Sequence, residues 1–368
     1  MLKKNLIVKL GINAKESSNL LSSISGKQKN LALKKLQKNL FKDKNEIIKV
    51  NKKDIQNAKI NKISSSLIDR LTLNSNSIDN MINGIGEIIE LDDPIGNIIS
   101  KWTRPNGLHI QKISVPLGVI GMIYESRPNV TVDASAIALK SGNSIILRGG
   151  KDSYHSSCKL NNIINTSFSE AKLPANIVQM IPSTKRSAID EMIKLDKYID
   201  VIIPRGGKQL IKKIKEKSLI PIIKHLDGIC HIFIEKNANL KIAKDVVFNS
   251  KMRRPGICGA AETLLIDKSL SNNVIEILEP LIKSNCEIRA DKFIHKLNPL
   301  FKKVKKEDWK TEYLDKIISV KLVDGINEAI QHINHYSSGH TESIITEKNE
   351  VFKKFYKDIN SAIILQNA

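Results

Sequence analysis

Cysteine is scarce in this sequence. The 368 residues contain 4 cysteines, and no two of them stand in a C-x-x-C pair. Disulfide frameworks and zinc sites need cysteines that are dense or closely spaced, so we expect neither, and we predict no metal site. Unpaired thiols are typical of a reducing compartment, which favours a cytoplasmic protein.

Aromatic residues and long apolar runs are also rare. Only 4% of the residues are aromatic, which leaves few side chains to stack on nucleic-acid bases. The net charge of +21 comes mainly from lysine spread along the whole chain, so we expect no nucleic-acid partner. No stretch approaches the roughly 18 uninterrupted apolar residues of a membrane span, and we expect no membrane partner. A positive field would still attract anionic substrates.

Proline is absent from the first 93 residues, where apolar residues recur at helical spacing. Leu33, Leu36 and Leu40 illustrate the pattern, which predicts a helical N-terminal layer. Asp93-Pro94 closes this layer, and a polar connection is expected around 102–107.

From His109 onward, short β-rich runs alternate with helical segments. In the first half we expect strands at 113–124, 144–147, 177–181, 201–203 and 220–223. In the second half we expect strands at 229–234, 263–266, 287–290, 317–322, 343–346 and 362–365. Such strand-helix repeats predict an α/β fold with parallel, doubly wound sheets. The expected domains are 1–225, which includes the helical layer, and 226–360, followed by a return strand at 361–368.

The segment Asn249 to Thr263, NSKMRRPGICGAAET, presents one cysteine at a sharp turn. Pro255 biases Arg254 away from helix and Gly256 permits a tight bend, so Cys258 should lie on a connection between packed elements. Neighbouring arginines raise the reactive thiolate fraction of a cysteine. The segment therefore indicates a nucleophile, and the alternative is a buried structural thiol.

Two turns at the carboxyl ends of predicted strands carry an arginine beside paired glycines. They are Arg148-Gly149-Gly150 and Pro204-Arg205-Gly206-Gly207. Glycines at such ends let backbone N–H groups approach a phosphate. Neither turn matches a G-x-G-x-x-G motif or a P-loop, so they are either anion-binding turns or ordinary connections.

An amide and two histidines are further candidates. Asn129 either caps the helix expected from Val130 or donates a hydrogen bond to a developing oxyanion. His225 or His231, if it lay beside Cys258, would form a Cys-His pair. The residues alone leave these alternatives open.

Several segments together resemble one family. They are the long segment from Arg104 to Gly150, IPRGG at 203–207, HLDGICH at 225–231, RRPGICGAAETLL at 253–265 and SSGHTESIIT at 337–346. In this order they are similar to the γ-glutamyl phosphate reductases of the aldehyde dehydrogenase superfamily, and the likeness runs over nearly the whole chain.

This resemblance implies NADPH-dependent reduction of L-glutamate 5-phosphate to glutamate 5-semialdehyde in proline biosynthesis. It implies that Cys258 displaces phosphate and holds the acyl group as a thioester, with Asn129 and the Cys258 N–H as the oxyanion hole. It also implies that the first domain binds the dinucleotide, with Arg148, Gly206 and Gly207 at the cofactor, and that the second domain is catalytic.

The chain departs from the family pattern at several places. His225 stands where hydrolytic relatives carry the glutamate that activates water, and we expect it to meet phosphate or move a proton. Gly259 stands where many members have asparagine, and Leu226 where glycine is common. Members usually continue for a few dozen residues past the equivalent of Ala368, through a loop at the cofactor and a strand that joins a neighbouring subunit. The resemblance implies a homo-oligomer, and the shorter C-terminus argues against closure of the site over the cofactor, against homo-oligomer formation and against activity in this chain.

Two other functions remain open at this point. One is a catalytically silent member of the family that serves as an association partner, for example of glutamate 5-kinase. The other is an aldehyde dehydrogenase that acts on another acyl substrate.

Overall fold

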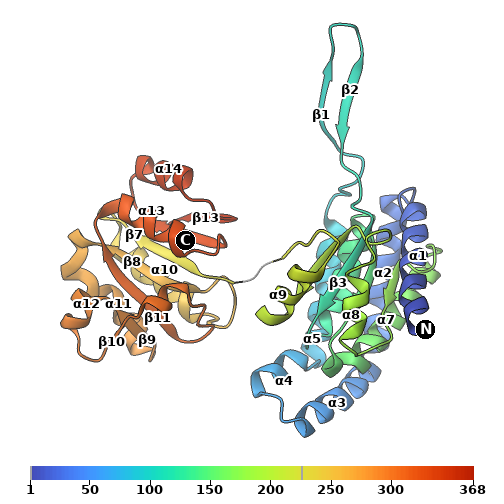
Figure 1. Ribbon diagram of the computed structural model, residues 1–368, viewed down its shortest axis with the longest axis horizontal. Coiled ribbons are helices and arrows are strands. Elements are labelled where there is room, and N and C mark those ends of the chain that lie inside the picture. The colour runs from blue at the N-terminus through green and yellow to red at the C-terminus, as the bar shows by residue number, and fades with distance from the viewer. Residues whose placement is uncertain (1, 225–226) are drawn as a thin grey trace. The chain divides into compact units, whose positions relative to one another are not determined.

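The computed structural model describes residues 2–224 and 227–368. The chain divides into two compact units, Met1–Lys224 and His225–Ala368, and each unit contains its own sheet (Figure 1). Within the described ranges, no helix is long and apolar enough to span a bilayer, and no cluster of three His, Cys, Asp or Glu side chains could hold a metal ion.

The N-terminal layer is helical, as predicted. Its helices are α1 Leu2–Leu21, α2 Gly26–Lys42, α3 Lys44–Ile60, α4 Ser65–Leu71 and α5 Ser75–Glu90. Leu33, Leu36 and Leu40 of α2 are fully buried because their spacing puts them on one face of the helix. That face packs into the core of the first unit.

The first unit is built on a parallel sheet. Its strands are β3 Val119–Tyr124, β4 Ser144–Arg148, β5 Val178–Met180 and β6 Val201–Arg205, in the order β5-β4-β3-β6. The elements between them are α6 Asn129–Lys140, the 3₁₀ turn η1 Lys151–Ser153, α7 Tyr154–Glu170, α8 Ser187–Met192 and α9 Lys208–Lys217.

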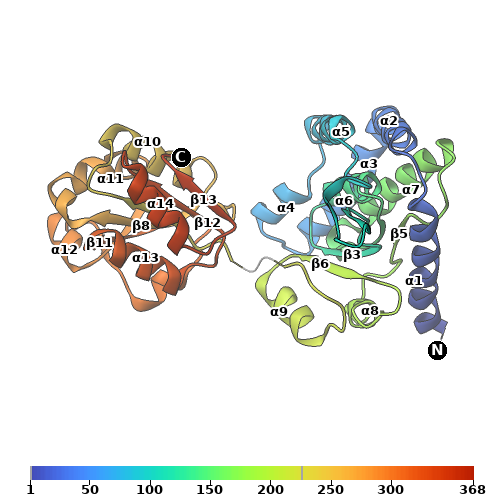
Figure 2. The same ribbon diagram turned by 90° about the horizontal axis from the view of Figure 1, so that it is seen from above.

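Helices cover both faces of this sheet. The helices α2, α5, α6 and α7 share one apolar core with it, and α1, α8 and α9 lie on the opposite face (Figure 2). This is the doubly wound arrangement that the strand-helix alternation predicts. The chain passes from β3 outward to β4 and β5, then returns to the other side of β3 as β6. The strand order therefore reverses between β3 and β6, the point where open α/β sheets bind ligands.

One local prediction in this unit is wrong, and one strand was missed. Residues 220–223 do not form a strand, because only one isolated bridge joins Ile222 to Ile202, and Pro221 has no N–H with which to extend the ladder. The strand β1 Ile98–Thr103 was not expected. It pairs with β2 His109–Ile113 in an antiparallel hairpin, and the connection expected around 102–107 is the end of this hairpin, whose turn contains Gly107 at a φ of 86°.

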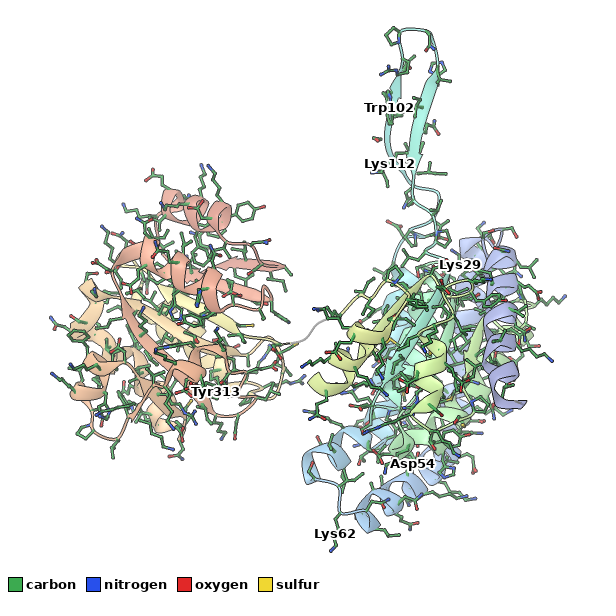
Figure 3. All side chains as sticks on the ribbon, viewed as in Figure 1. Lys29, Asp54, Lys62, Trp102, Lys112 and Tyr313 are labelled. Carbon is green, nitrogen blue, oxygen red and sulfur yellow. The ribbon has the colours of Figure 1, made fainter. Side chains whose placement is uncertain are left out.

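This hairpin, residues 98–113, is called the arm below. It extends away from the sheet of its own unit, with Trp102 and Lys112 on its two strands (Figure 3). All residues of β1 are exposed, and the apolar side chains of Ile98, Ile99 and Trp102 are 47–60% exposed. The arm thus contributes nothing to the core of its unit.

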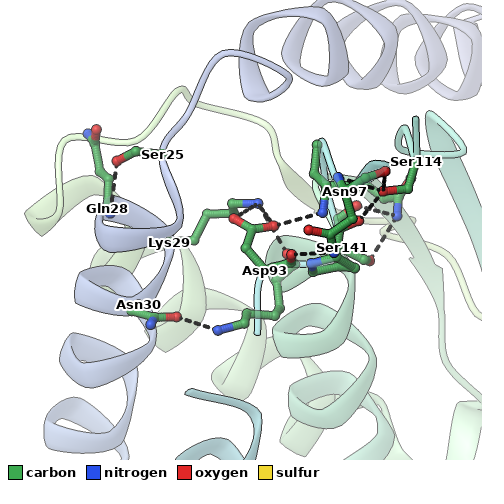
Figure 4. Close-up of polar contacts among 12 residues, drawn as sticks. Ser25, Gln28, Lys29, Asn30, Asp93, Asn97, Ser114 and Ser141 are labelled. Carbon is green, nitrogen blue, oxygen red and sulfur yellow. Dashed lines mark hydrogen bonds and ion pairs between the residues drawn. The ribbon is translucent and has the colours of Figure 1, made fainter. Parts of the chain in front are cut away.

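The base of the arm is fixed by a buried lysine. Lys29 of α2 is 2% exposed and forms an ion pair with Asp93 at 2.8 Å. It also donates to the Lys140 carbonyl at 3.2 Å, while Asn97 donates to the Asp93 carbonyl (Figure 4). These contacts join α2, the end of α6 and the segment that leads into the arm.

The second unit is also a doubly wound parallel sheet. Its strands are β7 Cys230–Ile234, β8 Ala261–Asp267, β9 Glu287–Ala290, β10 Lys302–Lys303, β11 Ile317–Val323, β12 Thr341–Ile345 and β13 Ile363–Gln366, in the order β10-β9-β11-β8-β7-β12-β13. Its helices are α10 Leu240–Met252, α11 Val274–Lys283, α12 Lys292–Leu297, α13 Gly325–Tyr336 and α14 Asn349–Asp358, with 3₁₀ turns η2 Lys268–Asn273 and η3 Lys306–Lys310. Every strand expected in this half is confirmed, and only the short β10 was not expected.

Candidate active site

Cys258 lies on the loop between α10 and β8, residues 253–260, called the nucleophile loop below. Its side chain is exposed, because Pro255 and Gly256 end the helix and turn the chain before the strand begins. This exposure contradicts the alternative of a buried structural thiol. The loop lies at the amino end of β8, which stands between β11 and β7 in the sheet, and β12 follows on the far side of β7.

The residues that open β7 hold the main chain of Cys258. Gly228 approaches it so closely that a Cβ at position 228 would lie 1.8 Å from the Cys258 carbonyl oxygen. The Gly228 N–H donates to Glu312 Oε1 at 2.8 Å. Cys230 Sγ–H donates to the Cys258 carbonyl at 3.2 Å. Burial, reinforced by the Glu342 carboxylate, raises the pKa of Cys230 to about 12, so this thiol stays protonated and acts as a donor.

His340 is a neighbour of the nucleophile loop that the sequence did not single out. Its Nδ1 is 3.7 Å from Cys230 Sγ, and a Cβ at Gly259 would lie 3.8 Å from its Cε1. His340 belongs to the SSGHT segment, which carries part of the family likeness. This likeness is the sequence feature that could have pointed to His340. Spacing alone gave it no role, because it is 82 positions from Cys258 in the chain.

The two histidines proposed as partners of Cys258 have different outcomes. His231 is fully buried, and its Nδ1 lies 3.1 Å from Glu342 Oε2. The ring is packed edge-on against His332, with centroids 5.7 Å apart. A buried imidazole engaged in this way is a core residue, so a Cys258–His231 pair is not supported. His225 lies outside the described residues.

Asn129 is the first residue of α6 in the first unit. The N-cap of the helix is Pro128, so the alternative that Asn129 caps the helix is wrong. Its Nδ2 donates to Asp133 Oδ2 at 2.9 Å, one turn further along the same helix. Burial raises the pKa of Asp133, and the Asn129 bond acts against that rise. A primary amide has two N–H donors, and this bond uses one of them while it fixes the side chain.

Arg148 ends β4 and is buried at 6% exposure. Its guanidinium donates to the carbonyls of Thr184 and Lys185 at 2.8 and 3.4 Å, and burial lowers its pKa. Within the described part of the chain, its Nε has no hydrogen-bond partner. The side chain therefore joins the end of β4 to the connection after β5.

The paired-glycine turn after β6 already holds an anionic oxygen. The Gly207 N–H, at the start of α9, donates to Glu125 Oε2 at 3.0 Å. A Cβ at Gly206 would lie 2.7 Å from the same oxygen. Glu125 follows β3, so this contact bridges β3 and β6 at the reversal of the strand order. A turn whose N–H donates to a carboxylate oxygen has the donor and the space that a phosphate oxygen needs.

Known proteins resemble this chain in both sequence and fold. Residues 7–292 match the sequence model of the Aldehyde dehydrogenase family. A gamma-glutamyl phosphate reductase of Brucella suis is 47% identical over 99% of this chain and 87% of that protein. The crystal structure of gamma-glutamyl phosphate reductase from Thermotoga maritima is 40% identical, with a TM-score of 0.95, and covers 98% of this chain and 88% of its own. The corresponding Saccharomyces cerevisiae structure is 33% identical, with a TM-score of 0.57, and covers 98% of this chain and 91% of its own.

Proposed function

Because the chain belongs to the gamma-glutamyl phosphate reductases of the aldehyde dehydrogenase family, we propose that it reduces L-glutamate 5-phosphate to glutamate 5-semialdehyde and phosphate through a thioester on Cys258. The observation that carries the proposal is the 47% identity over 99% of the chain. The Cys258 thiol is exposed on a turn that contains glycine, while Cys230 holds the Cys258 main chain through its carbonyl. Both features support the role of Cys258 as the nucleophile.

The first step is acyl transfer. The Cys258 thiolate attacks the acyl carbon, the bond between that carbon and the phosphate oxygen breaks, and phosphate leaves with the electron pair. Negative charge develops on the acyl oxygen during the attack and needs N–H donors that are already oriented. We assign this role to the Cys258 N–H and to the amide of Asn129, whose orientation is fixed by Asp133. His225 is assigned to the departing phosphate.

The second step needs a nicotinamide cofactor, which we propose to be NADPH. When bound, it supplies the hydride that converts the thioester to the aldehyde. Gly206 and Gly207 would hold its phosphates in place of the Glu125 carboxylate, since that turn already binds an anionic oxygen. Arg148 would supply positive charge at the neighbouring strand end. The side chain of Glu125 is exposed and can leave the turn without disturbing the core.

We also propose that the protein is a homo-oligomer in which the arm contacts a second subunit. A two-stranded hairpin is at best marginally stable alone in water, and this one exposes Ile98, Ile99 and Trp102. Contact with another copy would cover these side chains and pair the open edges of the hairpin.

The function is tested by phosphate-dependent oxidation of glutamate 5-semialdehyde, which is the reverse reaction and avoids the labile acyl phosphate. We expect reduction of NADP to require phosphate, and Cys258→Ser to lower turnover on the order of 10³-fold or more. Cys158→Ser removes a thiol elsewhere and serves as the matched control, with unchanged turnover. Full activity of Cys258→Ser, or activity with coenzyme A in place of phosphate, would contradict the proposal.

A further inference from the structure

A buried ion pair joins the two stems of the nucleophile loop. Lys251 is near the end of α10 and Glu262 is near the start of β8, on either side of Cys258. Both side chains are 0% exposed, and Lys251 Nζ lies 2.6 Å from Glu262 Oε2. The pair therefore closes the base of the loop, as a crosslink between the last turn of the helix and the first residues of the strand.

The same two side chains rest on a turn from a distant part of the unit. Glu262 Oε1 accepts the Leu314 N–H at 3.3 Å, and Lys251 Nζ lies 5.9 Å from the centre of the Tyr313 ring, which Figure 3 labels. At the bend of the loop, a Cβ at Gly256 would be 3.8 Å from the Leu314 carbonyl oxygen. The Tyr313-Leu314 turn thus contacts both the base and the bend of the loop.

This turn is itself held firmly. The Tyr313 hydroxyl lies 2.7 Å from Ser319 Oγ on β11. The Arg289 guanidinium stacks 4.9 Å from the centre of the Tyr313 ring and pairs with Asp308 at 2.6 Å. Contacts from β9, β11 and η3 therefore fix the surface against which the nucleophile loop packs.

Stability alone does not account for the ion pair. Two apolar residues of similar volume often stabilise a protein as well as a buried ion pair or better, because the charges must be desolvated. A buried pair does impose one direction and one distance on the groups that it joins. Here the ion pair also holds the Glu262 side chain where its Oε1 accepts the hydrogen bond from the Leu314 N–H. Apolar residues would fill the space but would not fix the loop in one arrangement.

We propose that Lys251 and Glu262 are positioning residues, which set the main-chain position of Cys258 by clamping both stems of its loop to the Tyr313-Leu314 turn. The inference rests on the proposed function in that it assumes Cys258 to be the nucleophile. Neither residue is assigned a contact with substrate or cofactor.

The test replaces the pair with apolar residues of similar size, in Lys251→Met/Glu262→Leu. In the folded double variant, we expect hydrogen exchange of the 253–260 segment to become at least about tenfold faster, because the loop has lost its crosslink. We also expect kcat to fall by about 10- to 100-fold with KM changed less than about threefold, because misplacement of a reacting atom acts on the transition state. Wild-type exchange and wild-type kcat in the folded double variant would overturn the proposal.

Two further variants keep the outcome interpretable. Lys321→Met/Glu328→Gln removes a partly buried ion pair elsewhere in the unit, and it should leave both the loop exchange and kcat unchanged. If the apolar double variant does not fold, Glu262→Gln takes its place, because a neutral amide keeps an oxygen for the Leu314 N–H while it removes the charge. We expect faster loop exchange in this variant, and unchanged exchange would again overturn the proposal. Hydrogen exchange requires no turnover, so a failure of the reductase assay is distinguishable from a failure of the clamp.

Discussion

At the scale of single residues, two glycines beside Cys258 differ in the space around them. A Cβ at Gly228 would lie 1.8 Å from the Cys258 carbonyl oxygen, whereas one at Gly259 meets only His340 Cε1 at 3.8 Å, an ordinary contact. We expect Gly228→Ala to displace the Cys258 backbone, to cost about 1–3 kcal/mol of stability through overpacking and to lower kcat by about 100-fold. Gly259→Ala is the matched control and should stay within about threefold of wild type. Equal activity of the two variants in the semialdehyde assay would contradict this account.

His332 makes the stability of the second unit depend on pH. Burial, followed by repulsion from His231, Lys321 and His335, lowers its pKa from 6.5 to about 3. Between these values the unfolded chain binds a proton that the folded chain does not. This group therefore adds stability as pH rises through the window, by up to about 1.4 kcal/mol per pH unit, and loses it on acidification.

Urea unfolding at pH 4, 5, 6 and 7 tests this dependence. We expect His332→Met to flatten the rise of the unfolding free energy with pH, because a methionine has no proton to gain. His335→Gln, an exposed position on the same helix, is the control and should retain most of the slope. An unaltered slope in His332→Met would show that other groups set the dependence.

Some residues of the site follow from sequence and others do not. The exposure of Cys258 could be predicted because Pro255 and Gly256 dictate a turn without any long-range contact. The place of His231 could not be predicted because every residue of β7 is buried, so no alternation distinguishes its two faces. Glu125 was missed because it meets Gly207 across 82 positions of chain, and only the pairing of β3 with β6 brings them together.

At the scale of elements, the strands of the second unit were predictable because parallel strands buried on both faces appear as short apolar runs. The two errors in the first unit also have physical reasons. Residues 220–223 are apolar but contain a proline, which limits their pairing to one bridge. The arm has no apolar alternation because neither of its faces packs on the unit's own core. Periodicity reports burial, and an element that buries nothing in its own chain gives no periodic signal.

The ion-pair network at the base of the arm predicts that replacement of Lys29 strongly lowers the stability of the protein. Lys29→Met leaves Asp93, which is 29% exposed, without its buried cation. We expect a loss of about 3 kcal/mol, at the lower end of the range for breaking a buried pair. Lys44→Met breaks a pair with Asp79, which is 45% exposed, and should cost no more than about 1 kcal/mol. Urea unfolding of both variants measures the difference, and equal losses would contradict it.

At the scale of the whole molecule, each unit carries one part of the proposed chemistry at a different end of its sheet. In the first unit the candidate groups follow the carboxyl ends of β3, β4 and β6, in line with the rule for open α/β sheets. In the second unit Cys258 precedes β8, at the amino end. The position of the nucleophile therefore depends on its loop and its supporting contacts, and strand order alone would not have located it.

The arm gives a prediction for the assembled protein. We expect Ile99→Glu/Trp102→Glu to lower the mass measured by sedimentation, because two charges would be buried against the second subunit. The melting temperature of the first unit should change little, since both side chains are exposed in the single chain. Lys101→Glu/Lys112→Glu, a polar change on the same hairpin, is the control. An unchanged mass in the apolar-to-acidic variant would remove the arm from the interface.

The hydrogen bond between Glu125 and the Gly207 N–H affects which anions the turn can bind. A carboxylate tethered beside the turn is present at a high effective concentration, so any free ion that enters must first displace it. Inorganic phosphate is released in every forward turnover. It makes few other contacts with the protein, so it would displace the carboxylate poorly. A dinucleotide makes many, so the Glu125 side chain would protect the proposed cofactor-binding turn, Gly206-Gly207, from occupation by phosphate.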